Sequence, residues 1–178
     1  MSRIHIIVFF AFLSTLNLSA QKNESIDIQA GLVFQKTQHL YWENGIGADL
    51  TSDFLFHKKI HLKATYLSSR FGSAIGSNAI RQDQLMIGAD WHFRSKKNLQ
   101  ILTGLNTGFF KADYGNSLFD VLPDQSMLLS VETGLNYRFR FPVSTSLTVG
   151  YNLINGDGVK VPGSLFPVFY RLNVYYCF

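Results

Sequence analysis

The chain has 178 residues, a length that suits a single domain. Aromatic residues make up 15% of the sequence and charged residues only 16%, against about a quarter in an ordinary soluble domain. The formal net charge of +4 is small, and no basic run with interleaved aromatic residues occurs, so nucleic-acid binding is not expected. The single cysteine, Cys177, excludes an internal disulfide and is expected to be a buried hydrophobic residue.

The N-terminal segment has the features of a secretory signal peptide. Arg3 supplies a positive charge, IIVFFAFL is a short apolar core, and Leu18-Ser19-Ala20 ends in a small residue. A membrane-anchor helix is the alternative, but the apolar run is shorter than the roughly 20 residues that a spanning helix needs. We therefore predict a signal peptide over residues 1–20 and a mature domain over residues 21–178.

The mature chain alternates apolar and polar residues with a period of two, which is typical of strands with one apolar face. In the first such segment, Ile28 and Leu32 share a face opposite Gln29. No helical segment lies between the strands. Eight strands are predicted, at residues 25–35, 45–54, 60–69, 84–94, 99–110, 129–141, 143–153 and 170–178. Short connections after the second, fourth and sixth strands alternate with longer ones after the others.

The two faces of these strands differ in a way that predicts a membrane barrel. One face is large and aromatic, while the other is rich in Gly, Ser, Asn and Gln, which suits the crowded interior of a narrow barrel. The charges on the polar face balance and could pair inside. These are the acids Asp27, Asp49, Asp53, Asp90 and Glu132 and the bases Lys63, Arg94, Arg138, Arg140 and Arg171.

If the apolar face meets lipid, the sheet must close, because backbone groups in hydrocarbon have no water to bind. The predicted fold is thus all-β, an eight-stranded antiparallel up-and-down transmembrane β-barrel, and the last strand pairs with the first. A soluble periplasmic barrel with its apolar face inward is the alternative. Aromatic residues near the strand ends would form two interfacial girdles. One rim would carry Phe54, Phe56, Trp91, Phe93, Phe139, Phe141, Tyr176 and Phe178, and the other Phe34, Phe109, Tyr151 and Phe166.

The terminal stretch YRLNVYYCF resembles the C-terminal assembly signal of bacterial outer-membrane proteins, in which Tyr176 and Phe178 would be the key residues. In pattern, length and terminus, residues 25–178 resemble the small eight-stranded outer-membrane barrels of the OmpA and OmpX type. The resemblance implies an integral location in the outer membrane of a Gram-negative bacterium, contact with outer-membrane lipids and insertion by the barrel-assembly machinery. It also implies that both termini and the short turns face the periplasm and the longer connections face outward.

Three candidate sites follow from this topology. The lumen charges could gate a narrow pore, but a static salt-bridge plug is favoured because eight strands leave little free bore. Simple hairpin registers would bring Asp53, His61 and His92 together as a weak candidate metal site, with ordinary interior hydrogen bonding as the alternative. In the loops, Tyr41, Trp42, Leu118 and Phe119 could bind a partner or dip into lipid headgroups.

An enzyme is not expected, and no cofactor is predicted. His39 is the only histidine in an outward loop, and no local motif links it to a nucleophile and an acid. The available partners are Ser68, Ser69, Ser73, Ser77, Asp113 and Asp120. The favoured function is a structural, adhesive or accessory subunit of a larger outer-membrane complex. A lipid A-modifying enzyme and a narrow solute pore are the alternatives.

Overall fold

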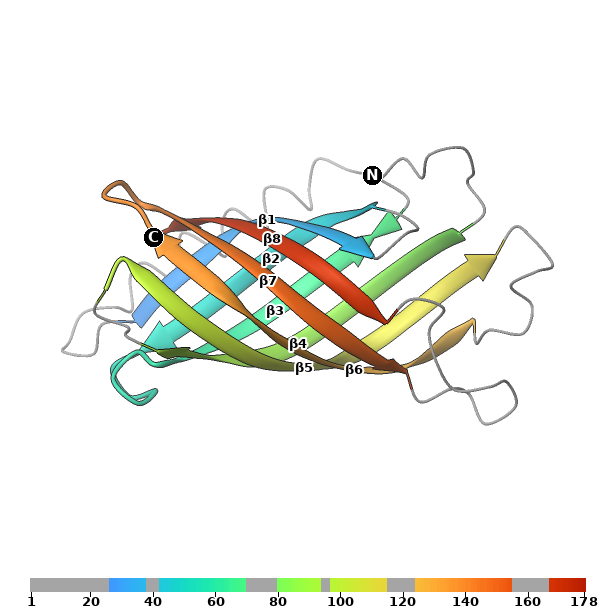
Figure 1. Ribbon diagram of the computed structural model, residues 1–178, viewed down its shortest axis with the longest axis horizontal. Coiled ribbons are helices and arrows are strands. Elements are labelled where there is room, and N and C mark those ends of the chain that lie inside the picture. The colour runs from blue at the N-terminus through green and yellow to red at the C-terminus, as the bar shows by residue number, and fades with distance from the viewer. Residues whose placement is uncertain (1–25, 38–41, 70–79, 94–96, 115–123, 155–166) are drawn as a thin grey trace, which may run out of the picture.

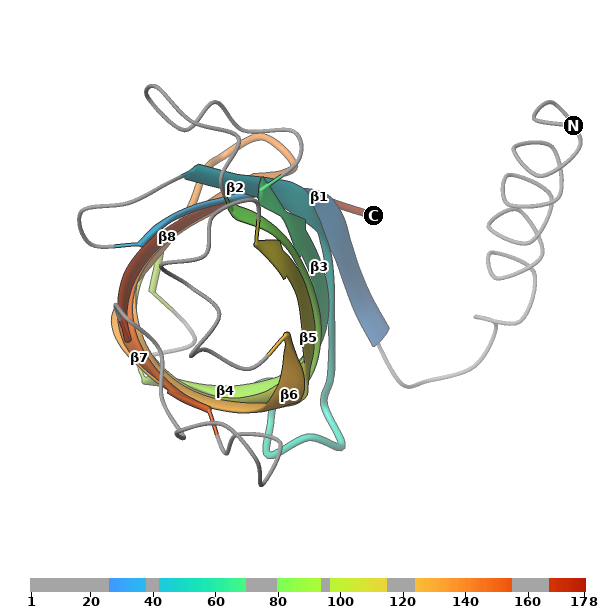
Figure 2. The ribbon, with the colours of Figure 1, turned by 90° about the vertical axis from the view of Figure 1, so that its right-hand side faces the viewer.

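The computed structural model describes residues 26–37, 42–69, 80–93, 97–114, 124–154 and 167–178. Its strands form one closed antiparallel barrel in chain order (Figures 1 and 2), so the predicted fold is confirmed. The predicted signal peptide lies outside the described residues. Within those ranges no helix is long and apolar enough to cross a membrane. The strands are β1 (Ile26–Thr37), β2 (Trp42–Ser52), β3 (Ile60–Ser68), β4 (Ile80–Phe93), β5 (Leu99–Tyr114), β6 (Gln125–Arg138), β7 (Val143–Ile154) and β8 (Val168–Cys177).

The barrel closes where β1 pairs with β8. Their ladder runs from the Gln29–Cys177 pair to the Thr37–Phe169 pair, and the Phe178 amide donates a hydrogen bond to the Ile28 carbonyl at 2.9 Å. Every strand therefore has a hydrogen-bonded neighbour on both sides, and no edge is left unpaired. Closure satisfies the backbone groups internally, as hydrocarbon requires.

Along most of each strand, side chains alternate between the interior and the outer wall. Along β6, Leu128, Ser130 and Glu132 are buried, whereas the intervening residues are exposed. The exposed residues are the apolar ones: Ile46, Leu85 and Ile87 each leave about 60% of their surface uncovered. An apolar surface that extends around the whole wall is not compatible with a soluble monomer and is typical of contact with lipid.

The exposed apolar residues form a belt around the wall. This apolar belt has a definite limit toward the end of the barrel that carries the longer connections. On β6 the outward-facing residues from Met127 to Tyr137 are uncharged and mostly apolar. That stretch rises about 25 Å along the barrel axis, taking roughly 3.3 Å per residue and a strand tilt of about 40°. The next outward-facing positions of β2 to β6, which are paired strand to strand, are polar and mark where the apolar wall ends. This polar row consists of Asn44, Ser68, Asp83, Lys111 and Gln125, of which Ser68 is buried against Asp83.

Aromatic residues gather at both limits of the belt, as predicted. At the end with the short turns, called the turn end below, Phe139 stacks on Phe141 with ring centroids 5.0 Å apart, and Tyr176 contacts Phe178 edge-on at 5.1 Å. At the opposite, outward end, Phe109 and Tyr151 face out from β5 and β7. Phe34 also lies toward that end, and Phe166 is outside the described residues.

Several strands are longer at the outward end than predicted. β4 begins at Ile80 and β5 continues to Tyr114, and the ladder still pairs Arg81 with Asp113. β2, which begins at Trp42, and β6, which begins at Gln125, also extend beyond their predicted ends. The predicted ends were wrong because polar residues on the outer face mark where the apolar wall ends, not where pairing stops. Cys177, expected to be buried, is half-buried at the turn end.

The β2–β3 connection, residues 53–59, has an unusual backbone. Phe56, His57 and Lys58 have φ angles of 51°, 56° and 62°, and none is glycine. The left-handed region costs such residues about 1–2 kcal/mol each, so the segment carries strain. The His57 amide donates to the Asp53 carbonyl at 2.9 Å, which helps to close the turn.

The seam between β1 and β8 depends on a glycine. A Cβ added to Gly31 would lie 2.0 Å from the backbone oxygen of Val174 and 2.8 Å from the Cα of Tyr175. Because these are backbone atoms in a paired strand, they cannot move aside without disturbing the ladder that closes the barrel.

We therefore expect Gly31→Val to cost about 1–3 kcal/mol or more through overpacking, and to lower the fraction of chains that fold in detergent or lipid vesicles. Heat-dependent gel mobility measures that fraction. The matched control is Ala30→Val, which adds bulk to the next residue on the outer wall. Equal folding of both variants would contradict the close approach at the seam.

Candidate functional site

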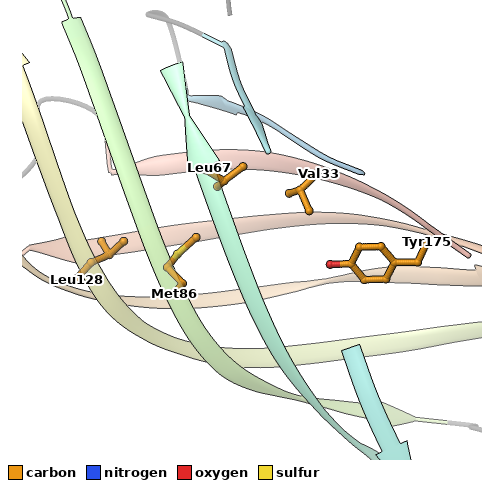
Figure 3. Packing of buried hydrophobic residues seen from close by; sticks show 5 residues of the cluster. All are labelled: Val33, Leu67, Met86, Leu128 and Tyr175. Atoms are coloured by element: carbon orange, nitrogen blue, oxygen red, sulfur yellow. The ribbon is translucent and has the colours of Figure 1, made fainter. Parts of the chain in front are cut away.

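The interior of the barrel is filled by two groups of side chains. One is an ionic core, made by Lys63, Asp90, Glu132 and Arg171. The other is an apolar cluster of Val33, Leu67, Met86, Leu128 and Tyr175, which point into the lumen from five different strands (Figure 3). Both groups lie on the face that also carries the glycines and small polar residues.

Glu132 is the centre of the ionic core. Its carboxylate accepts hydrogen bonds from Asn106 Nδ2 at 3.0 Å, Thr148 Oγ1 at 2.8 Å and Arg171 Nη1 at 3.3 Å, and it pairs with the Lys63 ammonium. Donors surround both carboxylate oxygens, so the buried charge is fully solvated by the protein. The donors come from β3, β5, β7 and β8, and the contacts therefore converge on Glu132 from several sides of the barrel.

The two bases of the core each have a second partner. Lys63 Nζ lies 2.7 Å from Asp90 Oδ1. Arg171 is only 2% exposed, and its Nε and Nη2 donate to Gln35 Oε1 at 3.0 and 2.7 Å. Two carboxylates and two cations thus form a neutral group, which is the arrangement that offsets the cost of removing charges from water.

Glu43, a fully buried carboxylate near the outward end, was not among the predicted lumen charges. Gln35 Nε2 and Gln84 Nε2 donate to its two oxygens at 2.6 and 2.7 Å. Residue 43 was assigned to a connection because the second strand was predicted to begin at residue 45. The alternation from Asp49 back through Gly45 already pointed inward at Glu43, so the signal was present in the sequence.

Two histidines do meet inside the barrel, but with a different acid from the one predicted. The rings of His61 and His92 are stacked with centroids 3.8 Å apart, and His61 Nδ1 lies 2.8 Å from Asp49 Oδ1. The His92 Nδ1 makes a 2.7 Å hydrogen bond to Gln100 Oε1.

The predicted approach of Asp53 to His61 is wrong. The ladder pairs Asp49 with Lys63, and Asp53 is exposed in the turn. The turn spans seven residues, so the hairpin is wider than the simple register assumed. Among the described residues no group of three or more His, Cys, Asp or Glu side chains is arranged to hold a metal ion.

The predicted balance of five acids and five bases inside the lumen is also wrong. Arg140 is exposed in the β6–β7 turn, and Arg138 is half-buried at the end of β6. Asp27 pairs with Lys58 at 3.0 Å at the turn end, where both are partly exposed. Arg94 lies outside the described residues. Sequence alternation placed Asp27 and Arg138 on the correct strands, but the charges near the strand ends reach solvent.

The outward residues singled out in the sequence are only partly described. Trp42 belongs to β2 rather than to a loop, and the Lys36 ammonium lies 5.5 Å from its ring. Tyr41, Leu118, Phe119, His39, Ser73, Ser77 and Asp120 lie outside the described residues.

The structure does not bring Ser68, Ser69 and Asp113, the described residues weighed as catalytic partners, together with a histidine as a catalytic triad would require. Ser68 donates to Asp83 at 2.6 Å, and the Ser69 hydroxyl accepts from the Gln82 amide at 2.7 Å. Both serines lie at the outward end of β3, whereas His61 and His92 lie near the turn end. Asp113 is exposed on β5.

Solved structures share this architecture. The N-terminal β-barrel domain of OprF from Pseudomonas aeruginosa superposes with a TM-score of 0.59 at 13% identity, over 88% of this chain and 98% of that one. The chain has the fold of the small eight-stranded outer-membrane barrels. Neisserial surface protein A gives a TM-score of 0.55 at 15% identity, over 88% of this chain and 97% of that one.

A barrel from the de novo design of transmembrane β-barrels is similar as well, with a TM-score of 0.53 at 12% identity over 85% of this chain and 95% of that one. No protein-family model and no curated protein sequence matches. The predicted resemblance is therefore confirmed as a fold, and a fold that also exists as a design carries no particular activity.

The ionic core predicts an asymmetric response to mutation. Arg171→Met leaves Glu132 with one cation fewer in a buried site, and we expect a loss of about 3–5 kcal/mol of unfolding free energy. Adding Glu132→Gln restores a neutral Lys63–Asp90 pair, so the double variant should lose less than the sum of the single losses.

Urea unfolding of the protein refolded in lipid vesicles would measure these losses. Arg140→Met is the matched control, and because Arg140 is exposed in a turn its effect should stay within about 0.5 kcal/mol. A wild-type stability for Arg171→Met alone would contradict the role of the ionic core.

Proposed function

We propose that this chain is an integral outer-membrane protein whose lumen is plugged by its own side chains. The exposed apolar belt, the aromatic residues at its two limits and the fold support insertion into a bilayer. In this proposal the short turns face the periplasm, the longer connections face the exterior, and a signal peptide over residues 1–20 directs export.

The observation that carries the plug is the direction of the ionic contacts. Glu132 on β6 is reached by Lys63 from β3 and by Arg171 from β8, and none of these strands is a neighbour of another in the barrel. The side chains therefore cross the bore that Figure 2 views nearly end-on. The apolar cluster also fills part of the bore, with side chains that are mostly apolar and do not provide the polar lining of a water-filled channel.

We expect the folded protein to show no steady current in planar bilayers, because ions would have to displace both the ionic core and the apolar cluster. Heat-dependent gel mobility of the same preparation must first show that the barrel has folded, so that silence reflects a plug and not a failure to insert. A stable conductance that scales with voltage would overturn the plug and favour the alternative of a narrow solute pore.

We further propose that the protein acts through its outward surface or lipid face, as a structural, adhesive or accessory subunit. A filled interior provides no path for transport, and Ser68 and Ser69 lie at the outward end of β3, away from His61 and His92 near the turn end. Beyond the polar row, β4 and β5 carry the exposed residues Arg81 and Asp113, which pair in the ladder. Such a surface suits contact with another protein or with lipid headgroups.

The assembly signal remains part of this proposal. Tyr176 and Phe178 lie edge-to-face at 5.1 Å and are both more than half exposed at the turn end. Residues that face outward at the closing strand are accessible to an insertion machinery.

Gentle detergent extraction from the native membrane, followed by mass spectrometry, tests the proposed role. We expect stoichiometric protein companions if the chain is a subunit. Recovery of the barrel with lipid alone would contradict the subunit role, and a change in lipid A acylation on deletion of the gene would favour the alternative of an enzyme.

A further inference from the structure

Three basic residues lie together at the turn end of the barrel. Lys97 in the β4–β5 turn and Arg140 in the β6–β7 turn are exposed, and Arg138, the last residue of β6, is half-buried. We call these three residues the basic patch. None of the ion pairs between described residues includes a member of the basic patch. The bases of the ionic core, in contrast, are both paired with carboxylates.

Hydrogen bonds hold the two turns of the basic patch side by side. The Arg138 amide donates to the Asn98 carbonyl at 2.8 Å. Gln100 Nε2 donates to the Lys97 carbonyl at 3.1 Å, and Asn136 Nδ2 donates to Gln100 Oε1 at 3.3 Å. In Figure 1 the arrowhead of β6 and the start of β7 lie at the same end of the barrel as the C-terminus. Lys97 is therefore fixed beside the end of β6 that carries Arg138.

The side chains at this end of β6 point to different sides of the wall. Alternation places Arg138 on the lumen side with the buried Asn136. Tyr137 and Phe139 face outward and contact each other edge-on with centroids 4.8 Å apart, and Phe139 stacks on Phe141. The aromatic rings thus occupy the lipid side. A ligand reaches Arg138 from the water at the turn end and not from the bilayer.

The Arg138 side chain has a donor without a partner. Its Nε is buried and has no hydrogen-bond acceptor among the described residues. Buried polar groups in folded proteins are nearly always hydrogen-bonded, so this donor calls for an explanation. The donors of a guanidinium form a planar fork that matches the two oxygens of a carboxylate. A carboxylate that engages Arg138 would satisfy the donor.

We propose that the basic patch binds an acidic segment of a periplasmic partner protein, whose carboxylates contact Arg138 on the lumen side and Lys97 and Arg140 on the turns. Three unpaired cations on two turns suit a chain that carries several carboxylates, because each contact makes the next one intramolecular. The inference rests on the proposed function, in which the short turns face the periplasm. It adds a partner at the end of the barrel opposite to the outward surface.

Peptide binding to the protein in phosphatidylcholine nanodiscs tests the basic patch, because both ends of the barrel are accessible there. The probe is a short fluorescein-labelled oligoglutamate peptide, followed by fluorescence anisotropy at low ionic strength. We expect the triple variant Lys97→Gln, Arg138→Gln and Arg140→Gln to bind the peptide at least about tenfold more weakly than the wild type, since three exposed charge pairs are lost. Added salt should weaken binding to the wild type.

The matched control removes the same charge from the outward end. Lys36→Gln, Arg81→Gln and Lys111→Gln change three exposed cations, and oligoglutamate binding should stay within about twofold of the wild type. An equal loss in both triple variants would reduce the effect to net charge and overturn the inference. A second variant, Lys97→Glu with Arg140→Glu, alters only exposed turn residues and should abolish binding even where Arg138→Gln prevents folding.

Heat-dependent gel mobility separates the possible failures. A barrel that does not fold or insert overturns the proposed function, whereas a folded wild-type barrel that binds no oligoglutamate overturns only the basic patch. Native mass spectrometry in mixed phosphatidylcholine and phosphatidylglycerol micelles examines the other source of anions. Retention of phosphatidylglycerol by the wild type and its loss from the Lys97→Glu, Arg140→Glu variant, without peptide binding, would assign the patch to lipid and overturn the protein partner.

Discussion

The need to satisfy every backbone amide and carbonyl without water is the constraint on which this structure depends. β1 meets it by pairing with β8, and once the sheet closes, each strand must present one face to the surroundings and one to a narrow interior. The apolar belt and the polar lumen are both consequences. A hairpin or an open sheet with the same sequence pattern would leave a row of unpaired groups in hydrocarbon, where no solvent could bind them.

Closure then creates a second problem, because the polar interior is itself removed from bulk water. The ionic core solves it by combining two carboxylates with two cations around Glu132. At Glu43, two glutamine amides donate hydrogen bonds directly to the carboxyl group. Amide donors around Glu43 and cations around Glu132 thus serve the same end in two parts of the lumen. Contacts that link β3, β6 and β8 across the bore also join strands that the ladder does not connect.

A filled barrel moves the question of function to its surface. Similar folds occur in a domain of OprF, in Neisserial surface protein A and in a designed protein, so the architecture alone does not select a role. In this chain the distinctive surface features lie at the two ends. The wall continues past the belt on β4 and β5, and the β2–β3 turn projects two phenylalanines outward. Both features concern contact with the surroundings rather than passage through the barrel.

Local alternation was enough to predict the strands and their faces, because a period of two directs neighbouring residues to opposite sides whatever the partner strand is. The outward-facing Ile87 and the inward-facing Glu132 could both be assigned in this way. The registers could not, since the offset of a hairpin depends on the conformation of its turn. The left-handed β2–β3 turn placed Asp49, not Asp53, against His61.

The membership of the ionic core was decided only when distant strands met around the barrel. Lys63 and Glu132 are separated by 69 residues, and the sequence pattern near either residue does not predict that they make contact. The strand ends at Trp42 and Ile80 likewise depended on ladder pairing above the belt, which hydropathy does not record. The chain alone thus specifies which side chains point inward, because that is a property of each strand. Which inward side chains touch is a property of closure, because it depends on the stagger of all the strands together.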